Sequence, residues 1–79
     1  MSCMTKIRTA ADARTAYRIA RDACVARGWT KAGFNARVRI IAEGNMEEDR
    51  RAGLDVREDR HYAHVAIRAE LGFLDHMKA

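Results

Sequence analysis

The 79-residue sequence predicts an all-α fold, a compact bundle of three to four helices in a single domain that spans residues 1–79. The chain contains no proline, the residue that interrupts helices most strongly. Apolar residues recur at intervals of three and four, which is the period of an amphipathic helix. The five glycines are Gly28, Gly33, Gly44, Gly53 and Gly72, and four of the five stand where a helix would end.

The size and composition indicate a thin core. A chain of this length buries only roughly 60% of the surface that the unfolded chain exposes. Fifteen alanines and twelve arginines make up about a third of the sequence, whereas branched and aromatic side chains are few. The helices should therefore pack closely, and a partner or a second copy in a homodimer would add buried area. Residues 1–8 are expected to form a flexible segment before the first helix.

The first helix is expected over residues 9–27. Thr9 is a typical N-cap residue, and Asp12 follows it three positions later, where an acidic side chain favours the first turn. The apolar positions that should face the core recur at intervals of one, three and four residues: Ala13, Ala16, Tyr17, Ala20, Ala23 and Cys24.

The second segment fits two structures. Trp29 and Phe34 flank Thr30 in the arrangement of a hydrophobic staple around an N-cap, which predicts a helix over residues 31–43. Residues 34–42 also alternate between apolar and polar, as a half-buried strand would, and a strand would make the fold α+β. The rest of the chain offers only weak partner strands, so the helix is preferred.

Two further helices are expected in the second half. Asn45 and Glu48 have the spacing of a capping box, which predicts a short helix to residue 52 with the acidic run 47–49 in its first turn. Asp55 and Glu58 have the same spacing before a helix over residues 56–71.

The last helix should bury one apolar face and then end. Its predicted core residues are Val56, Ala63, Ile67 and Leu71, with Tyr62 and Ala66 beside them. Gly72 should end the helix, and the apolar residues after it should fold back as a short turn: Phe73, Leu74 and Met77.

Charge is distributed unevenly along the chain. Residues 1–40 contain nine Lys or Arg and two acidic residues, a balance of 9 − 2 = +7. Residues 41–79 contain six and nine, a balance of 6 − 9 = −3, so the net charge of the whole chain is +4. A strongly basic half indicates a partner with an acidic or phosphate-bearing surface.

One candidate partner-binding set lies on the first helix. Arg14, Arg18 and Arg21 fall within an arc of about 60° on a helical wheel and span roughly 10 Å along the axis. This spacing suits contacts with successive phosphates or a row of carboxylates. A solvated helix face is the alternative, and Asp22 four residues after Arg18 would partly neutralise the set.

A second candidate set lies on the last helix, opposite its apolar face, and consists of Arg57, His61, His64 and Arg68. Histidine changes charge between about pH 5 and 8, so this surface could be pH-sensitive. A metal site at the two histidines with Glu58 is the alternative. The flanking arginines would repel a cation, and the sequence spacing supplies no further ligand, so no metal or other cofactor is expected.

The sequence does not predict an enzyme. It contains no nucleophile elbow and no phosphate-binding glycine loop. Cys24 falls on an apolar helix face, where a buried structural thiol is expected, and both Cys3 and Cys24 should be reduced. No signal peptide or membrane-spanning segment is recognisable, so a cytoplasmic location away from membranes is expected.

Residues 17–44 (YRIARDACVARGWTKAGFNARVRIIAEG), the small size and the lack of a catalytic motif resemble the small inhibitor proteins of phages and mobile elements. The resemblance is to an anti-CRISPR acting on a type I CRISPR surveillance complex, with subtype I-C among the candidates. It implies stoichiometric binding to a protein–RNA complex without turnover. That family shares no diagnostic motif, so the resemblance assigns no residue. The basic surface differs from the acidic, DNA-mimicking surface of many such inhibitors.

The sequence therefore predicts a non-enzymatic protein that inhibits or modulates a nucleic-acid-handling complex through basic helical surfaces. Its partner would be a host protein or a protein–RNA complex. Direct, weakly specific nucleic-acid binding is the second hypothesis, and a small metal-dependent or thiol enzyme is the third.

Overall fold

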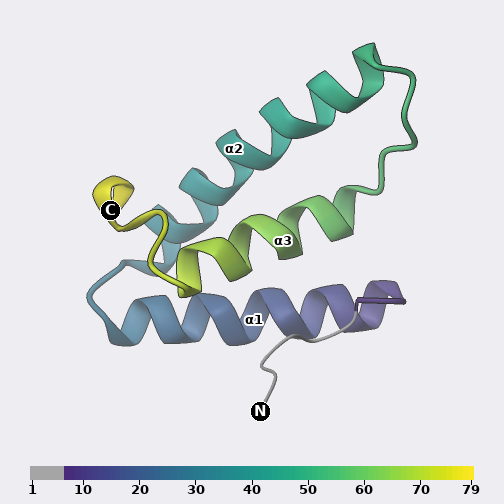
Figure 1. Cartoon of the computed structure of the whole chain (residues 1–79). Coiled ribbons are helices and arrows are strands. Elements are labelled where there is room, and N and C mark those ends of the chain that lie inside the picture. The colour runs from purple at the N-terminus through teal and green to yellow at the C-terminus, as the bar shows by residue number, and fades with distance from the viewer. Residues whose placement is uncertain (1–6) are drawn as a thin grey trace.

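The computed structural model describes residues 7–79 and is built from helices (Figure 1). The elements are α1 (Ala10–Ala26), α2 (Lys31–Arg51), α3 (Glu58–Glu70) and a short 3-10 helix, η1 (Asp75–Met77). The described residues contain no strand. The all-α prediction is therefore confirmed, and the alternative of a strand at residues 34–42 is wrong.

The helices pack as a small bundle in which α1 and α3 have the most extensive contact. They lie side by side and run in the same direction, while α2 diverges from them and returns to α3 through an extended connection (Figure 1). Of the segment expected to be flexible, residues 1–6 lie outside the described residues. Ile7 packs against the small cluster that joins the start of α1 to α3.

The two predicted threonine N-caps are present. The Thr9 hydroxyl accepts a hydrogen bond from the Asp12 amide at 3.1 Å, and the Asp12 carboxylate accepts one from the Thr9 amide at 3.2 Å. Backbone hydrogen bonds from Arg8 and Thr9 hold the pKa of Asp12 below its usual value. At the start of α2, the Thr30 hydroxyl accepts a hydrogen bond from the Gly33 amide at 3.0 Å.

The prediction that Gly44 separates two helices is wrong. α2 runs without interruption to Arg51, so Asn45 caps no helix and the acidic run 47–49 lies near a helix C-terminus. A mid-helix glycine costs only about 1 kcal/mol relative to alanine. The apolar stripe continues across Gly44 at intervals of four and is fully buried: Phe34, Val38, Ala42 and Met46. Burying that stripe outweighs the local cost of Gly44.

The start of α3 also differs from the prediction. The helix begins at Glu58 with Arg57 in the N-cap position and no side-chain cap, so the capping box of Asp55 and Glu58 is wrong. Its C-terminus is as predicted, because Gly72 takes a left-handed conformation with φ 93° just after the helix. Leu74 then folds back into the core, while Phe73 remains exposed.

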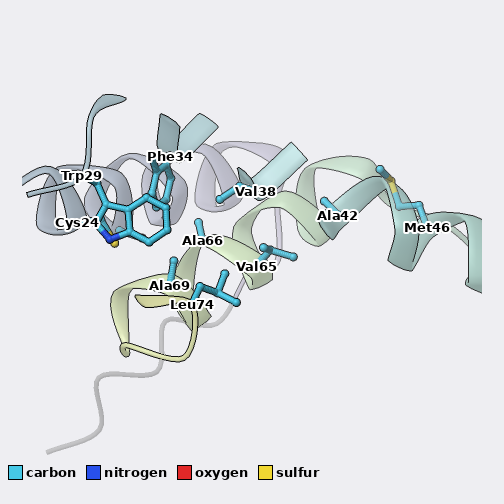
Figure 2. Packing of buried hydrophobic residues seen from close by; sticks show 11 residues of the cluster. Cys24, Trp29, Phe34, Val38, Ala42, Met46, Val65, Ala66, Ala69 and Leu74 are labelled. Carbon is cyan, nitrogen blue, oxygen red and sulfur yellow. The ribbon is translucent and has the colours of Figure 1, made fainter. Parts of the chain in front are cut away.

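The core is centred on the aromatic pair Trp29 and Phe34 (Figure 2). Their rings pack edge to face with centroids 5.7 Å apart, and Tyr17 packs on Phe34 in the same way at 5.5 Å. Cys24 is fully buried beside them, as predicted. The remaining members are small or aliphatic: Ala20, Val38, Ala42, Met46, Val65, Ala66, Ala69 and Leu74.

The predicted core face of α3 was only partly correct. Ala63 and Ala66 are buried, but Leu71 is 65% exposed. Val65, which the predicted core face did not include, is buried because α2 covers a second flank of α3. A helix that packs against two neighbours buries a wider arc than a single amphipathic stripe predicts.

Arg27 links the ends of α1 and α3. Its guanidinium donates hydrogen bonds to the backbone oxygens of Ala69 (3.0 Å) and Glu70 (2.9 Å) and to the Asp75 carboxylate (3.1 Å). The last carbonyls of a helix lack intrahelical partners and carry partial negative charge. Arg27 therefore satisfies the C-terminus of α3 from a neighbouring element.

The C-terminal residues pack over the start of α2. The Ala79 backbone oxygen accepts a hydrogen bond from the Thr30 amide at 2.8 Å, and Arg37 Nε donates one to the Met77 oxygen at 3.2 Å. Gly33 leaves room for this contact, because a Cβ at that position would lie 2.6 Å from the Ala79 oxygen. The chain thus uses a glycine where two backbone segments approach closely.

Two glycines in the same helix should respond oppositely to alanine. Gly44→Ala places a methyl group in open space and should raise the free energy of unfolding by about 0.5–1 kcal/mol. Gly33→Ala should lower the free energy of unfolding, because the new Cβ meets the Ala79 backbone and the Thr30 hydroxyl. Urea denaturation of both variants checks this. Equal stabilisation by both would show that the C-terminus does not cover Gly33.

Arg27 and Arg51 offer a second matched pair, because each forms an ion pair but only Arg27 also caps a helix. Arg27→Gln should lower the free energy of unfolding by about 1–3 kcal/mol, because its hydrogen bonds to the end of α3 are removed. Arg51→Gln should change it by less than about 1 kcal/mol, since its pair with Glu47 is exposed. Thermal unfolding of both variants measures the difference, and equal effects would contradict the capping role.

Candidate functional site

The second predicted basic set lies together in one surface groove. We define the α3 groove as a hollow of about 440 Å³ between the connection that follows α2, the end of α2 and the outer side of α3. All four predicted residues of the last helix line it. Its full lining is Asn45, Asp55, Arg57, Arg60, His61, His64, Val65 and Arg68.

The first predicted basic set lies in a second groove. We define the α1 groove as a shallow hollow of about 520 Å³ between α1 and the start of α3. Arg14, Arg18 and Arg21 all line it, together with residues that sequence reasoning did not assign to a surface site. These are Ala11, Ala13, Thr15, Tyr17, Asp59 and Tyr62.

Helical periodicity explains both placements. At about 100° per residue, each basic set occupies an arc of about 60° on its helix. Ala13, Ala16 and Ala20 bury the adjoining face of α1, and Ala63 and Ala66 bury that of α3. The basic side chains therefore lie along the edges of the packed faces. The two sets do not meet in one site, because they line grooves on different flanks of α3.

The two grooves contain arginines without acidic partners. Within residues 7–79, the side chains of Arg14, Arg18, Arg57 and Arg68 form no ion pair and donate no hydrogen bond to protein. Asp22 pairs with Arg21 at 3.2 Å, so it partly neutralises the set, as expected, but through Arg21 and not through Arg18. Unpaired guanidinium groups keep their donors free for an external acceptor.

His61 is more than a surface group, because both of its ring nitrogens have partners. Nδ1 lies 3.0 Å from the backbone oxygen of Arg57, and Nε2 lies 2.9 Å from Oδ2 of Asp49 on α2. A neutral imidazole has only one N–H, whereas both neighbours here are acceptors. The imidazolium form satisfies both contacts, so protonated His61 ties α2 to the start of α3.

The environment of His61 raises its pKa above the usual value. The largest cause is the hydrogen bond to the Arg57 carbonyl, and the hydrogen bond and charge of Asp49 act in the same direction. Desolvation and the positive charge of Arg50 act in the opposite direction. Sequence reasoning missed Asp49 because the predicted break at Gly44 assigned it to the start of a separate helix.

The structure also bears on two other chemistries considered from the sequence, a metal site at the histidines and a reactive thiol at Cys24. Among the described residues, no group of three His, Cys, Asp or Glu side chains is close enough to share a metal ion. His61 is already engaged by Asp49 and Arg57, and Glu58 lies outside the groove lining. Burial raises the pKa of the Cys24 thiol, which favours the unreactive protonated form. Cys3 lies outside the described residues.

Comparison of the chain with protein-family models, with curated proteins and with solved structures finds no match in any of the three. Among residues 7–79, no helix combines the length and the apolar composition needed to cross a membrane. The candidate residues are therefore supported by the groove geometry, by their pairing and by their charge.

The His61 contacts predict a pH dependence of stability. A group whose pKa is raised on folding stabilises the protein fully below its unfolded pKa, near 6.5, and loses this effect as pH rises through the folded pKa. His61→Gln should therefore reduce the melting temperature more at pH 5.5 than at pH 8.

The control is His64→Gln, because His64 is exposed and forms no hydrogen bond within the described residues. Melting curves at half-unit pH steps should give a parallel profile for this variant and the wild type. A His61→Gln profile that is also parallel to the wild type would contradict the proposal that protonated His61 links α2 to the start of α3.

Proposed function

We propose that this protein is a non-enzymatic binding protein that inhibits or modulates a nucleic-acid-handling complex by contacting its acidic or phosphate-bearing surface. One observation carries the proposal. All seven predicted basic residues line two grooves, and the unpaired arginines Arg14, Arg18, Arg57 and Arg68 are among them.

The chemistry of the grooves suits binding. Arginine stays protonated at any physiological pH, so it does not exchange protons with a substrate, but its planar fork fits phosphate and carboxylate groups. In the α3 groove, the two hydrogen bonds of His61 already occupy both ring nitrogens. These side chains can therefore hold an anionic surface, and none is arranged as a nucleophile with a base.

The overall charge supports the same proposal. The net charge of +4 and the +7 balance of residues 1–40 would attract a negatively charged complex before contact. The resemblance to anti-CRISPR inhibitors makes a type I CRISPR surveillance complex, a protein–RNA assembly, the first partner to test. Binding to such a complex would be stoichiometric, and an excess of salt would weaken it.

Charge removal at the α1 groove tests the proposal. Replacing Arg14, Arg18 and Arg21 with Gln lowers the net charge from +4 to +1 and removes three donors from one groove. Affinity for the purified surveillance complex, measured by biolayer interferometry, should fall by at least about tenfold, which corresponds to about 1.4 kcal/mol. Folding should be retained, because Gln is a good helix former and exposed ion pairs contribute little.

The matched control replaces Lys31, Arg50 and Arg51 with Gln, which also gives a net charge of +1 but leaves both grooves unchanged. This variant should bind nearly as well as the wild type. Equal loss in both variants would reduce the role of the arginines to long-range attraction. Absence of binding by the wild type would reject the complex as the partner.

A further inference from the structure

We propose that the α3 groove is a binding site for the phosphate backbone of a nucleic-acid strand. This inference rests on the proposed function and narrows it, because it assigns the groove to the nucleic acid of the complex and not to its protein surface. The ligand chemistry is a run of phosphodiesters, and RNA or single-stranded DNA could supply it.

The length of the groove indicates a linear ligand. Arg57 and Arg68 are eleven residues apart, which corresponds to about 16 Å along the helix axis at about 1.5 Å per residue. A single phosphate cannot contact both ends. A strand can, because its charges repeat at roughly 3.4 Å along the axis of a stacked helix. His64 lies between the two arginines on the same side of α3 and supplies a further donor.

The groove also has the charge that such a ligand requires. Its lining contains three arginines and one acidic residue, Asp55, a balance of 3 − 1 = +2 without the histidines. Arg60 makes only a long contact of 3.5 Å with the Arg8 backbone oxygen, so it is weakly held. The charges of His61 and Asp49 offset each other, and Asn45 is the α2 residue in the groove lining. The positive charge is therefore left on the side chains that face the hollow.

A phosphate strand fits this groove better than an acidic peptide does. Protein–protein contacts concentrate their binding energy in buried aromatic or aliphatic anchors. Among residues 7–79, the only hydrophobic side chain in the groove lining is Val65, which is 2% exposed and already part of the core. None of the large exposed hydrophobic residues lines the groove: Ile19, Val25, Ile40, Leu54, Leu71 and Phe73. Contacts with nucleic acid are instead polar and strongly basic.

The lining further predicts that binding depends little on base sequence. No aromatic side chain lines the α3 groove, so bases have no stacking platform there. The α1 groove differs in containing Tyr17 and Tyr62. Contacts to phosphates alone set affinity and orientation without reading bases. The affinity of the α3 groove should therefore depend steeply on salt and weakly on sequence.

The test uses the full chain and three fluorescein-labelled probes in fluorescence anisotropy titrations: a 12-mer oligouridylate, a 12-mer oligothymidylate and an oligoglutamate peptide of equal charge. At about 50 mM salt the two oligonucleotides should bind and the peptide should bind at least about tenfold more weakly. Replacing Arg57 and Arg68 with Gln should weaken oligonucleotide binding by about tenfold or more. It should also reduce the slope of log affinity against log salt by about 1.4, which is about 0.7 for each phosphate that the variant no longer neutralises.

The matched control replaces Arg50 and Arg51 with Gln, which lowers the net charge from +4 to +2 as the groove variant does. Equal weakening by both variants, or equal affinity for oligoglutamate, would overturn the phosphate site. A third outcome would also overturn the phosphate site: the protein captures the surveillance complex through Arg57 and Arg68 but binds no oligonucleotide. That outcome would leave the proposed function intact. Oligonucleotide binding without capture of the complex would support the site and reject the surveillance complex as the partner. A preference between the two oligonucleotides would identify the source of the phosphates.

Discussion

The close packing of the alanine faces of α1 and α3 is the constraint on which the rest of the structure depends. Ala13, Ala16 and Ala20 of α1 are buried, as are Ala63 and Ala66 of α3. Alanine allows two helices to approach closely and loses no side-chain entropy, but each one buries little apolar area. The contact therefore fixes the positions of α1 and α3 without supplying much stability. Larger side chains from α2 and specific polar contacts at the helix ends must supply the remainder.

Polar contacts stabilise the helix ends, where the alanine packing between α1 and α3 contributes least. Arg27 caps the C-terminus of α3 from the end of α1, and the Ala79 backbone oxygen meets the Thr30 amide at the start of α2. At the opposite end of α3, His61 holds its first turn against Asp49 of α2. The first two contacts join segments that are far apart in sequence, and the third joins consecutive helices. Together these three contacts hold the helix ends in place in a small bundle that has few large side chains.

The parts of this structure that could be predicted from sequence are those determined by local interactions. The hydroxyls of Thr9 and Thr30 cap helices through amides three residues away, and the left-handed Gly72 ends α3 within one turn. The failures depended on tertiary contacts. Gly44 lies inside a helix because Met46 is buried beyond it; the apolar interval of four continues to Met46, but the glycine and the capping-box spacing of Asn45 and Glu48 favoured a break. Both basic sets were predictable from helical spacing. The grooves, the Asp49 contact and the capping role of Arg27 were not, because they depend on how α2 packs against α3 and how the end of α1 packs against the end of the chain.

The placement of the acidic residues explains why positive charge accumulates at the grooves. Asp12 accepts backbone hydrogen bonds at a helix start, Glu47 pairs with Arg50 and Arg51, Asp49 with His61 and Asp75 with Arg27. Asp12, Asp49 and Asp75 serve the caps and ties that hold the bundle together, and all four carboxylates have partners away from the unpaired groove arginines. The same interactions that stabilise a thin core therefore leave the excess positive charge on the two flanks of α3. A partner that places anionic groups in the two grooves would neutralise this excess positive charge.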